Sequence, residues 1–387
     1  MRKMKLAMLI VFCVMLFGGT VVSFVLPDRE FSDVENRELA KKPKITAKRI
    51  LSGEYQKEYD TYLSDQFFFR DKWVDLAVRE QIALGKKDFN GVYLGKNNYL
   101  LEKYEKADFD SGQIKENETY LTTFLNETEK RYGRKHVRAM FVPSKTTALT
   151  NVLPAYADTI DWQSMIRDLQ TKVDEPNLIY DLTKTMQSHN EEYIYYRTDH
   201  HWTTLGAYYA YTEFCKAKGI TPESLDAYSK KQDFDGFLGS FYNDTSDAKL
   251  KANPDTVTAY YPNAESICHV TASDGKKYDW PVIYDVSNYN AGLKYSTFIA
   301  SDNPYTEIEN KDLSDGSSCI VVKESFGNAF IPFLVDHYQT VYVVDYRYWT
   351  GSISKLAQDK KVNDVLFLNN LSMIRNKSLV GKLYRVL

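Results

Sequence analysis

The chain has 387 residues, of which 43% are hydrophobic and 26% charged, and its formal net charge is −3. This length and apolar content can build the core of one large domain or two, and they argue against a disordered protein. A mildly acidic balance also argues against nucleic acid or an anionic membrane surface as the main partner.

The amino end carries a basic flank followed by a long uncharged run. After Arg2, Lys3 and Lys5, residues 6–26 contain no charged side chain, and a helix of that length crosses the hydrocarbon layer of about 30 Å. We therefore predict an uncleaved signal-anchor, a single transmembrane segment in residues 1–27. The basic flank keeps the amino end inside, so the remainder is expected outside the cell membrane.

Residues 28–52 are polar and charged, which predicts an extended stalk. We expect residues 53–387 to form the extracytoplasmic domain. Cys13 lies in the uncharged run, which leaves Cys215, Cys268 and Cys319 in the rest of the chain. Three cysteines cannot all pair with one another, so no disulfide framework is expected to hold this domain.

Apolar residues recur at helical spacing between Glu54 and Leu84, where we predict one or two helices. Short strands joined by turns follow Asn90-Gly91. Further along the chain, helices alternate with buried strands: a helix over 120–131, a strand over 137–145, a helix over 162–172, a strand over 178–181 and a helix over 205–218.

Residues 222–303 interrupt this alternation with short β-like runs and turns, and we interpret them as a β-rich insertion that forms a wall over the site. The alternation then returns, with strands predicted at 319–323, 340–345 and 364–370 and helices at 326–335 and 352–361. Strand and helix alternating at this pitch predict a parallel sheet covered on both faces, a three-layer α/β/α fold.

The densest group of reactive side chains is the run Asp199-His200-His201, in a chain with only six histidines. A carboxylate beside an imidazole can fix the tautomer of the ring and stabilise its protonated form, as a general base requires. Because neighbouring residues of an extended turn point to opposite sides, Asp199 and His201 share a side and His200 points away. His201 is therefore the better candidate base.

A serine that can serve as the nucleophile follows the strand predicted at 319–323. In the turn Glu324-Ser325-Phe326, the Ser325 hydroxyl can project into the crevice beyond the carboxyl ends of the strands. The N–H groups that begin the next helix can face a developing oxyanion. Ser325 can equally be a helix cap. Its occurrence together with Asp199 and His201 favours the nucleophile.

Several of these segments carry a resemblance to a known family. They are ENREL, DQFFFRD, NGVYLG, VPSK, TDHHW, KESFGNAF and VVDYRYW. The chain resembles the bacterial DHHW family, which is similar in turn to the alginate-acetyltransferase type of SGNH-hydrolase-like domain. The resemblance implies a flavodoxin-like α/β/α domain with an Asp199–His201–Ser325 triad. It also implies acetyl-ester transfer or cleavage on an extracytoplasmic glycan, either of the cell envelope or of an exopolysaccharide.

This sequence departs from ordinary SGNH hydrolases in the order Asp, His, Ser and in its ESF turn. The order agrees with the permuted acetyltransferase-like group, but the second oxyanion donor is left open. Asn328 and the loop Ser301–Pro304, with Asn303, are the candidates. Arg347 follows a predicted strand and either binds a substrate oxygen or pairs with an acid.

Two other functions remain open on the sequence alone. A non-catalytic glycan-binding or assembly protein of the cell envelope would use the many aromatic side chains, 30 Tyr, 20 Phe and 5 Trp, as stacking faces. A metal-dependent hydrolase would use Asp199, His200 or His201 with His337, although no H-x-x-x-H or C-x-x-C spacing supports it. We expect no cofactor and no metal. The expected partners are a glycan and an acetyl donor, which a membrane acyltransferase can deliver.

Overall fold

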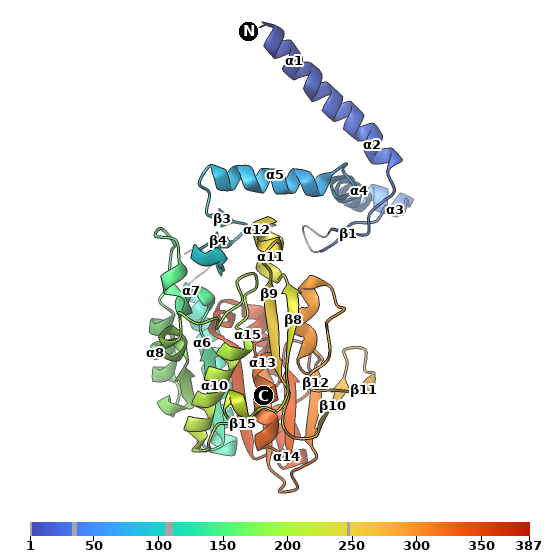
Figure 1. Ribbon diagram of the computed structural model, residues 1–387. Helices are drawn as coiled ribbons and strands as arrows, with labels where there is room; N and C mark the ends of the chain where they lie inside the picture. Colours follow the sequence, from blue (N-terminus) through green and yellow to red (C-terminus); the bar gives the residue numbers. More distant parts are fainter. Residues whose placement is uncertain (1, 33–36, 105–110, 246–247) are drawn as a thin grey trace. The chain divides into compact units, whose positions relative to one another are not determined.

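The computed structural model (Figure 1) describes residues 2–32, 37–104, 111–245 and 248–387. The chain divides into two units. Unit 1 comprises Met1–Lys87 with Tyr242–Ala252, and unit 2 comprises Asp88–Phe241 with Asn253–Leu387. The predicted anchor and stalk both fall in unit 1, and every candidate site residue falls in unit 2.

Unit 2 is built on an eight-stranded sheet with the order β11-β10-β12-β14-β13-β15-β6-β7. Its strands are β6 (Val137–Val142), β7 (Ile179–Asp181), β10 (Ser266–Thr271), β11 (Lys277–Trp280), β12 (Tyr305–Asn310), β13 (Ser318–Lys323), β14 (Thr340–Asp345) and β15 (Asp364–Asn370). The run from β14 to β7 is parallel, as predicted. Strands β12, β10 and β11 extend it antiparallel.

The sheet is therefore mixed, and this corrects the expectation of a parallel sheet. The predicted insertion also divides in a way that the sequence did not show. Its strands β10 and β11 lie at one edge of the main sheet, whereas β8 (Lys231–Phe237) and β9 (Asp255–Tyr260) form a separate antiparallel pair. A third, three-stranded sheet contains β3 (Asp88–Phe89), β4 (Val92–Leu94) and β5 (Leu100–Glu102).

Helices cover both faces of the main sheet, because its central strands are apolar on both sides. In β13, Cys319 and Val321 join one hydrophobic cluster, and Ile320 and Val322 join the other. The first cluster contains α7 (Lys145–Ala148), α9 (Thr183–Ser188), α10 (Thr204–Lys218) and α13 (Gly327–Leu334). The second contains α6 (Ser111–Tyr132), α8 (Trp162–Lys172), α14 (Ile353–Lys360) and α15 (Lys377–Arg385).

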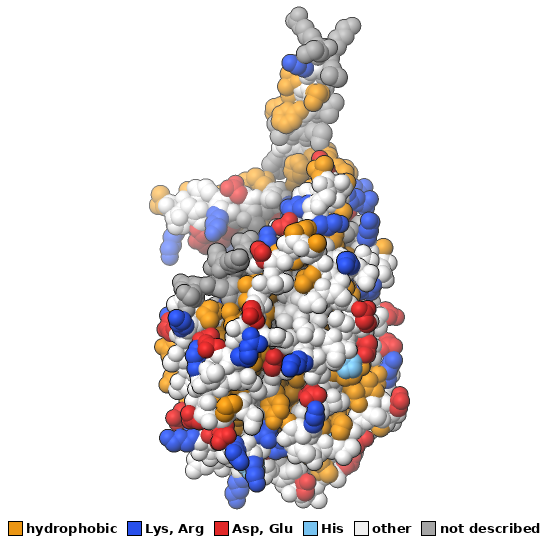
Figure 2. All heavy atoms as spheres, turned by 90° about the vertical axis from the view of Figure 1, so that its left-hand side faces the viewer, with side chains coloured by type: hydrophobic (Ala, Val, Ile, Leu, Met, Phe, Trp, Pro, Cys, Tyr) orange, Lys and Arg blue, Asp and Glu red, His pale blue; other side chains and the backbone are white. Residues whose placement is uncertain are grey.

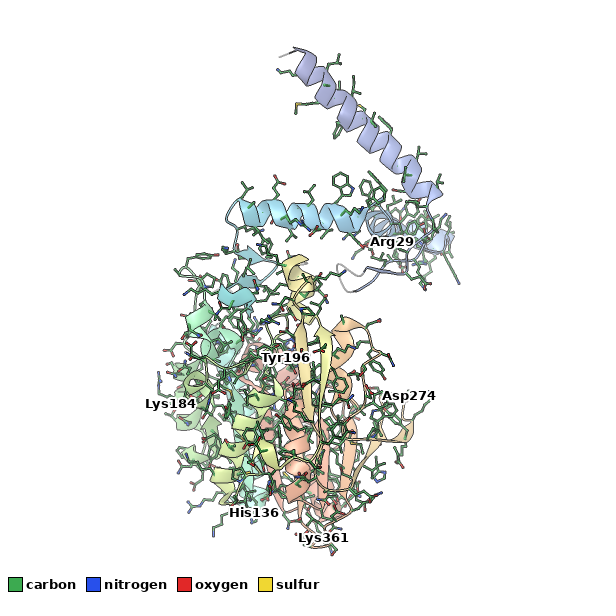
Figure 3. All side chains as sticks on the ribbon, in the orientation of Figure 1. Arg29, His136, Lys184, Tyr196, Asp274 and Lys361 are labelled. Atoms are coloured by element: carbon green, nitrogen blue, oxygen red, sulfur yellow. The ribbon has the colours of Figure 1, made fainter. Side chains whose placement is uncertain are left out.

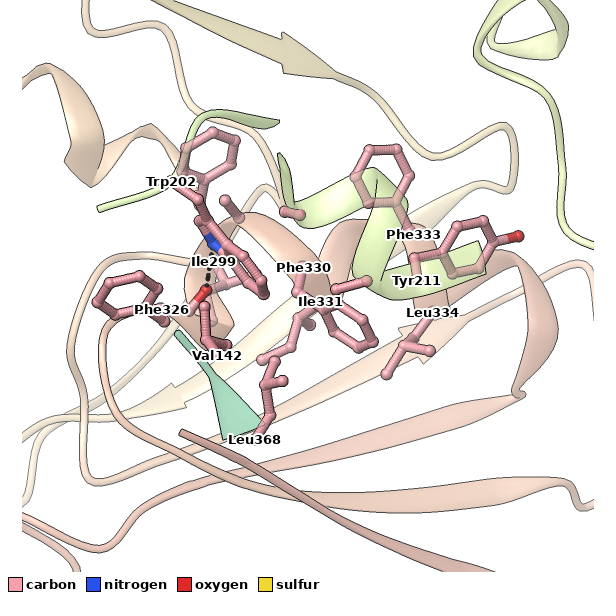
Figure 4. Close-up of a cluster of buried hydrophobic side chains, with 14 of the residues drawn as sticks. Val142, Trp202, Tyr211, Ile299, Phe326, Phe330, Ile331, Phe333, Leu334 and Leu368 are labelled. Carbon is pink, nitrogen blue, oxygen red and sulfur yellow. Dashed lines mark hydrogen bonds between the residues drawn. The ribbon is translucent and has the colours of Figure 1, made fainter. Parts of the chain in front are cut away.

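The first cluster reaches the predicted site directly (Figure 4). Trp202 is fully buried, and its indole N–H donates to the carbonyl oxygen of Phe326 at 3.0 Å. The indole and the Phe326 ring meet edge to face, with ring centroids 5.6 Å apart. This contact joins the segment with the two histidines to the turn that holds Ser325, across 124 positions of sequence.

The side chains of unit 2 sort as expected for a water-soluble α/β body. Tyr196 is fully buried inside it, while the exposed Lys184, Asp274 and Lys361 lie at its margin (Figure 3). On the face shown in Figure 2, acidic and basic side chains are interspersed over the surface. This distribution agrees with the small net charge of −3.

The amino end begins with α1 (Arg2–Cys13), a π-helical turn η1 (Val14–Gly18) and α2 (Gly19–Val25). Among the described residues, no helix is both long enough and apolar enough to cross a membrane. The signal-anchor predicted in residues 1–27 stays a prediction.

The predicted stalk contains a short pair of strands, β1 (Phe31–Ser32) and β2 (Arg37–Glu38), followed by α3 (Ala47–Leu51). The first two residues of the ENREL segment lie outside the described residues. The helical spacing seen after Glu54 gives two helices, α4 (Glu54–Asp65) and α5 (Arg70–Ala83).

Candidate active site

Ser325 lies where β13 ends and α13 begins, the position predicted from the sequence. The turn needs glycine at 327, since a Cβ there would lie 2.7 Å from the Cβ of Lys323. The N-cap position of α13 is held by Phe326, which makes no side-chain capping bond, so Ser325 is not the helix cap. Its Oγ instead lies 2.7 Å from Nε2 of His201, and Ser325 is buried with 8% exposure.

His201 is held on its other side by Asp199. Its Nδ1 lies 2.6 Å from Oδ1 of Asp199, and its backbone N–H donates to the same oxygen at 2.9 Å. A carboxylate at Nδ1 places the ring proton there, which leaves Nε2 free to accept from the Ser325 hydroxyl. The structure thus brings Asp199, His201 and Ser325 into one hydrogen-bonded line.

The second oxygen of Asp199 is also satisfied. Oδ2 accepts from the backbone N–H of Ser240 at 2.8 Å and from its hydroxyl at 3.0 Å. The chain approaches so closely that a Cβ on Gly239 would lie 2.1 Å from the Cβ of Asp199. Burial by itself raises the pKa of Asp199, but the two adjacent histidines and these hydrogen bonds hold that pKa well below its usual value.

His200 points away from Ser325, as the alternation of an extended turn predicts. Its Nδ1 pairs with the hydroxyl of Ser240 at 2.8 Å, and its side chain keeps 37% of its exposure. The ring still lies against that of His201, with centroids 3.8 Å apart. Burial, followed by the neighbouring His201, lowers the pKa of His200 to about 4.

Two buried charges brace residues 198–202, which we call the Asp199 loop. Asp255, fully buried, accepts from the backbone N–H of Thr198 at 2.7 Å and from its hydroxyl at 2.5 Å. Lys145, also fully buried, donates from Nζ to the carbonyl oxygens of Asp199 at 2.5 Å and Leu100 at 2.7 Å. Burial lowers the pKa of Lys145 to about 8.

Tyr295 contacts both His201 and Ser325. Its ring stacks on the His201 imidazole, with centroids 4.2 Å apart and planes inclined by 14°. Its hydroxyl donates to the carbonyl oxygen of Ser325 at 3.1 Å. Tyr295 belongs to the predicted insertion, in the 3₁₀ segment η7 (Ala291–Thr297), so this part of the insertion forms one wall of the site as expected.

Glu324 is a second carboxyl next to the serine. Its Oε2 lies 3.2 Å from Ser325 Oγ and accepts from the Phe326 N–H at 3.2 Å, while Oε1 accepts from the Asn370 N–H at 2.9 Å. Burial raises the pKa of Glu324 above its ordinary value, against the opposing effect of Arg347. The carboxyl group is therefore easier to protonate than an exposed glutamate.

A pocket of about 370 Å³ opens beside Ser325. Its walls combine aromatic and apolar side chains with polar ones. They are Glu102, Tyr104, His200, Phe241, Glu324, Ser325, Phe326, Arg347, Asn370, Ser372, Met373, Arg375, Asn376 and Leu379. The last five come from residues 372–379, at η9 (Leu371–Arg375) and the start of α15.

The remaining predicted residues lie less directly on the site. Arg347 pairs with Asp345 at 2.6 Å and Asp302 at 2.9 Å, which is one of the two sequence interpretations. It also lines the pocket, and its contact with a substrate oxygen stays a prediction. The Asn328 amide donates to Asp302 at 2.9 Å, and its Oδ1 has no partner in the described part of the chain.

Asn303 donates its amide to the carbonyl oxygen of Ala300 at 2.7 Å. Neither Asn303 nor Asn328 is among the residues that line the pocket, and their assignment as second oxyanion donors stays a prediction. Ile299, Ala300 and Ser301 have φ values of 47°, 60° and 67°, and this left-handed run turns the loop back on itself.

Asp199, His200 and His201 also form the one group in the described residues whose ligand atoms, all within 4.8 Å of one another, suit a metal ion. His337, the distant ligand considered from the sequence, is not in this group. Its Nε2 lies 2.5 Å from the Tyr211 hydroxyl instead. Both carboxylate oxygens of Asp199 already accept two hydrogen bonds each, which makes the set a poor fit for a metal.

Sequence reasoning assigned no role to Glu324, Lys145, Asp255 or Tyr295. The sequence could have pointed to Glu324, because this acidic residue lies beside the predicted nucleophile in a turn whose other residues are apolar or small. The sequence could also have pointed to Lys145, because this lysine ends an apolar run that was predicted to be buried. Asp255 and Tyr295 lie in a segment without a regular pattern, and nothing in the sequence there marks them.

Comparisons with known proteins identify the family of the chain and structures of similar fold. Residues 133–344 match the DHHW protein family. The crystal structure of a DHHW family protein from Eubacterium siraeum shares 27% sequence identity, covering 78% of this chain and 97% of that one, with a TM-score of 0.66. No curated protein sequence matches the chain significantly.

PatB1 from Bacillus cereus shares the fold at lower identity. Its structure has 23% identity and a TM-score of 0.59, covering 73% of this chain and 97% of that one. A second PatB1 structure, with a sulfonyl adduct, has 21% identity and a TM-score of 0.60, covering 76% of this chain and 99% of that one.

Proposed function

This chain belongs to the DHHW protein family, and we propose that it is a serine O-acetyltransferase or acetylesterase that acts on an extracytoplasmic glycan. In this proposal Ser325 is the nucleophile, His201 the general base and Asp199 the residue that orients His201. The observation that carries the proposal is the line of short contacts, 2.6 Å from Asp199 to His201 and 2.7 Å from His201 to Ser325.

The first half-reaction transfers the acetyl group to the serine. Ser325 Oγ attacks the carbonyl carbon of an acetyl ester, and its proton passes to Nε2 of His201. Asp199 stabilises the imidazolium that forms. The tetrahedral intermediate then collapses: the C–O bond to the leaving alcohol breaks, and Nε2 returns the proton to that alcohol. Ser325 is left as an acetyl ester.

The second half-reaction is the reverse with another acceptor. A glycan hydroxyl, or water, gives its proton to His201 and attacks the acetyl carbon, and Ser325 Oγ leaves with that proton. Transfer requires that water be kept from the acyl-enzyme while a sugar hydroxyl is admitted. Tyr104, Phe241 and Phe326 in the pocket walls give apolar faces of the kind that stack on sugar rings.

The glycan substrate and the acetyl donor are proposed from the sequence resemblance to the alginate-acetyltransferase type of SGNH-hydrolase-like domain. A flavodoxin-like core for unit 2 is part of the same proposal. The uncharged run in residues 6–26, with its basic flank, supports a location at the outer face of the cell membrane. An acetyl donor would then come from a membrane acyltransferase. Protease accessibility of unit 2 on intact cells tests this location.

A fluorophosphonate probe tests the assignment of the nucleophile. We expect the probe to label the full chain on Ser325, and Ser325→Ala to remove both the label and aryl acetate hydrolysis. Ser372→Ala is a matched control, because Ser372 lines the same pocket and its backbone N–H pairs with the Asn370 side chain. That variant should keep the label. Absence of label on the native chain, together with glycan binding that survives loss of all three triad side chains, would support the glycan-binding alternative.

A further inference from the structure

We propose that Glu324 is a further catalytic residue, a neutral carboxylic acid that donates a hydrogen bond to the reacting oxygens at Ser325. The inference rests on the proposed function, since it assigns a role within that reaction. It starts from contact: Glu324 Oε2 lies 3.2 Å from Ser325 Oγ, and the side chain lines the pocket that opens beside the serine.

The number of protons decides between a charged and a neutral Glu324. Ser325 has one hydroxyl proton and two neighbouring acceptors, His201 Nε2 at 2.7 Å and Glu324 Oε2 at 3.2 Å. A charged Glu324 competes with the imidazole for that proton. It also places a full negative charge next to the oxygen on which negative charge develops during attack, which raises the barrier.

A neutral Glu324 removes both problems. Its Oε2–H donates to Ser325 Oγ, and the serine hydroxyl then donates to His201 Nε2. His201 Nδ1–H in turn donates to Asp199. Every proton in this line has one acceptor. The second oxygen, Oε1, keeps the role of a carbonyl and accepts from the Asn370 N–H at 2.9 Å, the shorter of the two backbone contacts of this carboxyl.

The groups that face Glu324 permit the neutral form. The cation near it is Arg347, and the imidazole of His200, with its pKa lowered to about 4, is neutral above that pH. Two tyrosine hydroxyls, of Tyr295 and Tyr346, also lie close enough for the charge of Glu324 to raise their pKa values. Arg347 is already paired with Asp345 and Asp302, which weakens its pull on Glu324. The burial of this carboxyl, at 9% exposure, favours its protonated state.

The role fits the chemistry of the acyl-transfer step. As Oγ bonds to the acetyl carbon, the electron pair of the carbonyl moves onto the carbonyl oxygen, and the serine proton moves to His201. The Oε2–H of Glu324 can then turn from Oγ to the new oxyanion without leaving Glu324. It thus supplies an oxyanion donor from the wall of the pocket, in the way that buried neutral acids stabilise other oxyanions.

Glu324→Gln is the decisive variant, because glutamine has the same shape and stays neutral at every pH. The probe is phenylmethylsulfonyl fluoride, and the quantity is the initial rate of Ser325 labelling between pH 5 and pH 9, followed by mass spectrometry. Glu102→Gln is the matched control, since Glu102 lines the same pocket but pairs with the backbone of Lys145 and Thr146.

For the native chain we expect the labelling rate to fall once the pH is high enough to ionise Glu324, whose pKa is raised by burial. The fall is about tenfold per pH unit beyond the Glu324 pKa, as for any single ionisation. Glu324→Gln should lose this fall and label faster than the native chain at high pH. Glu102→Gln should keep the native shape of the profile.

Three results overturn the assignment. Labelling of Glu324→Gln that is more than a hundredfold slower at every pH means that the charged carboxylate is needed. An unchanged pH profile in Glu324→Gln means that the residue only supports the structure. If Glu324→Gln does not fold, the native profile alone still decides, because a labelling rate that falls at no pH at which the native chain stays folded leaves no neutral acid to titrate. A native chain that is not labelled on Ser325 at all contradicts the proposed function itself, which separates the two failures.

Discussion

Two groups of buried charges lie next to Ser325, and they are held in different ways. In the first group, the carboxylates at the Asp199 loop are bound by backbone N–H groups, hydroxyls and imidazoles. Asp255 accepts hydrogen bonds from Thr198, and Asp199 accepts them from Ser240 and His201. The second group, which we call the ion cluster, consists of Asp302, Lys323, Asp345 and Arg347. It pairs charge directly with charge, at 2.6 to 3.0 Å.

The two groups differ in what a proton can do in them. In the ion cluster, burial raises the pKa of Asp302, but Lys323 and Arg347 together hold that pKa well below its usual value. In the Asp199 loop, Nε2 of His201 lies 2.7 Å from Ser325 Oγ. Only the Asp199 loop therefore has an imidazole that can take the proton of Ser325 and return it. The ion cluster instead fixes the ends of β13 and β14.

The comparison predicts the largest effect for Asp199→Asn. An asparagine keeps the shape of the side chain, but its amide no longer requires the proton on Nδ1 of His201, so Nε2 can lose its role as acceptor. We expect the rate of aryl acetate hydrolysis to fall by about 10⁴-fold, as when a triad loses its aspartate. The unfolding midpoint of the same protein is the control. A fall of less than tenfold in a folded variant would show that Asp199 does not orient the base.

The next effect is expected in the ion cluster, and it should appear in stability rather than in rate. Lys323 has a side chain that is only 1% exposed and pairs with both Asp302 and Asp345. Lys323→Met leaves these two carboxylates without their buried cation, which costs about 3–5 kcal/mol of unfolding free energy. Urea unfolding measures this loss.

The rate of Ser325 labelling per folded Lys323→Met molecule should stay within a few-fold of the native rate, because no proton moves through the ion cluster. Lys323→Arg is the matched control, because arginine keeps the positive charge but changes the shape of the side chain. A Lys323→Met variant of native stability, or a folded one that no longer labels, would contradict the division between the two groups of charges.

The sequence predicted the parts of this architecture that have a strong local pattern. Strands β14 and β15 begin and end at the predicted residues, since continuous apolar runs bounded by turns identify buried strands. The D-x-H spacing and the serine at a strand end are short-range features, and they marked Asp199, His201 and Ser325 as candidates. That the three residues meet across 124 positions was expected from the family resemblance.

What the sequence did not predict depends on contacts between distant segments. Strand β12 joins the sheet antiparallel between β10 and β14, and the choice of partner for a short alternating run is made by sheet register across the whole unit. The single buried charges give no periodic signal at all. Lys145 meets Asp199 from 54 positions away, and Asp255 meets Thr198 from 57 positions away.

The smallest effect is expected at His200, the histidine that does not face Ser325. Its pKa in the folded protein is lowered to about 4, whereas an unfolded chain takes up a proton near pH 6.5. Between these values the unfolded state binds more protons, so stability decreases as the pH falls from about 6.5 to 4. In His200→Gln this contribution is absent, and the loss of unfolding free energy between pH 7 and pH 4.5 should be smaller than in the native chain.

The same His200→Gln variant separates the two adjacent rings by function. At pH 7 it should label on Ser325 at a rate within a few-fold of native, because His200 pairs with Ser240 rather than with the nucleophile. His201→Gln, the equivalent change one position along, should abolish labelling because Nε2 of His201 is the atom next to Ser325 Oγ. Equal loss in both variants would mean that the pair acts as one unit, and the base could then no longer be assigned to His201 alone.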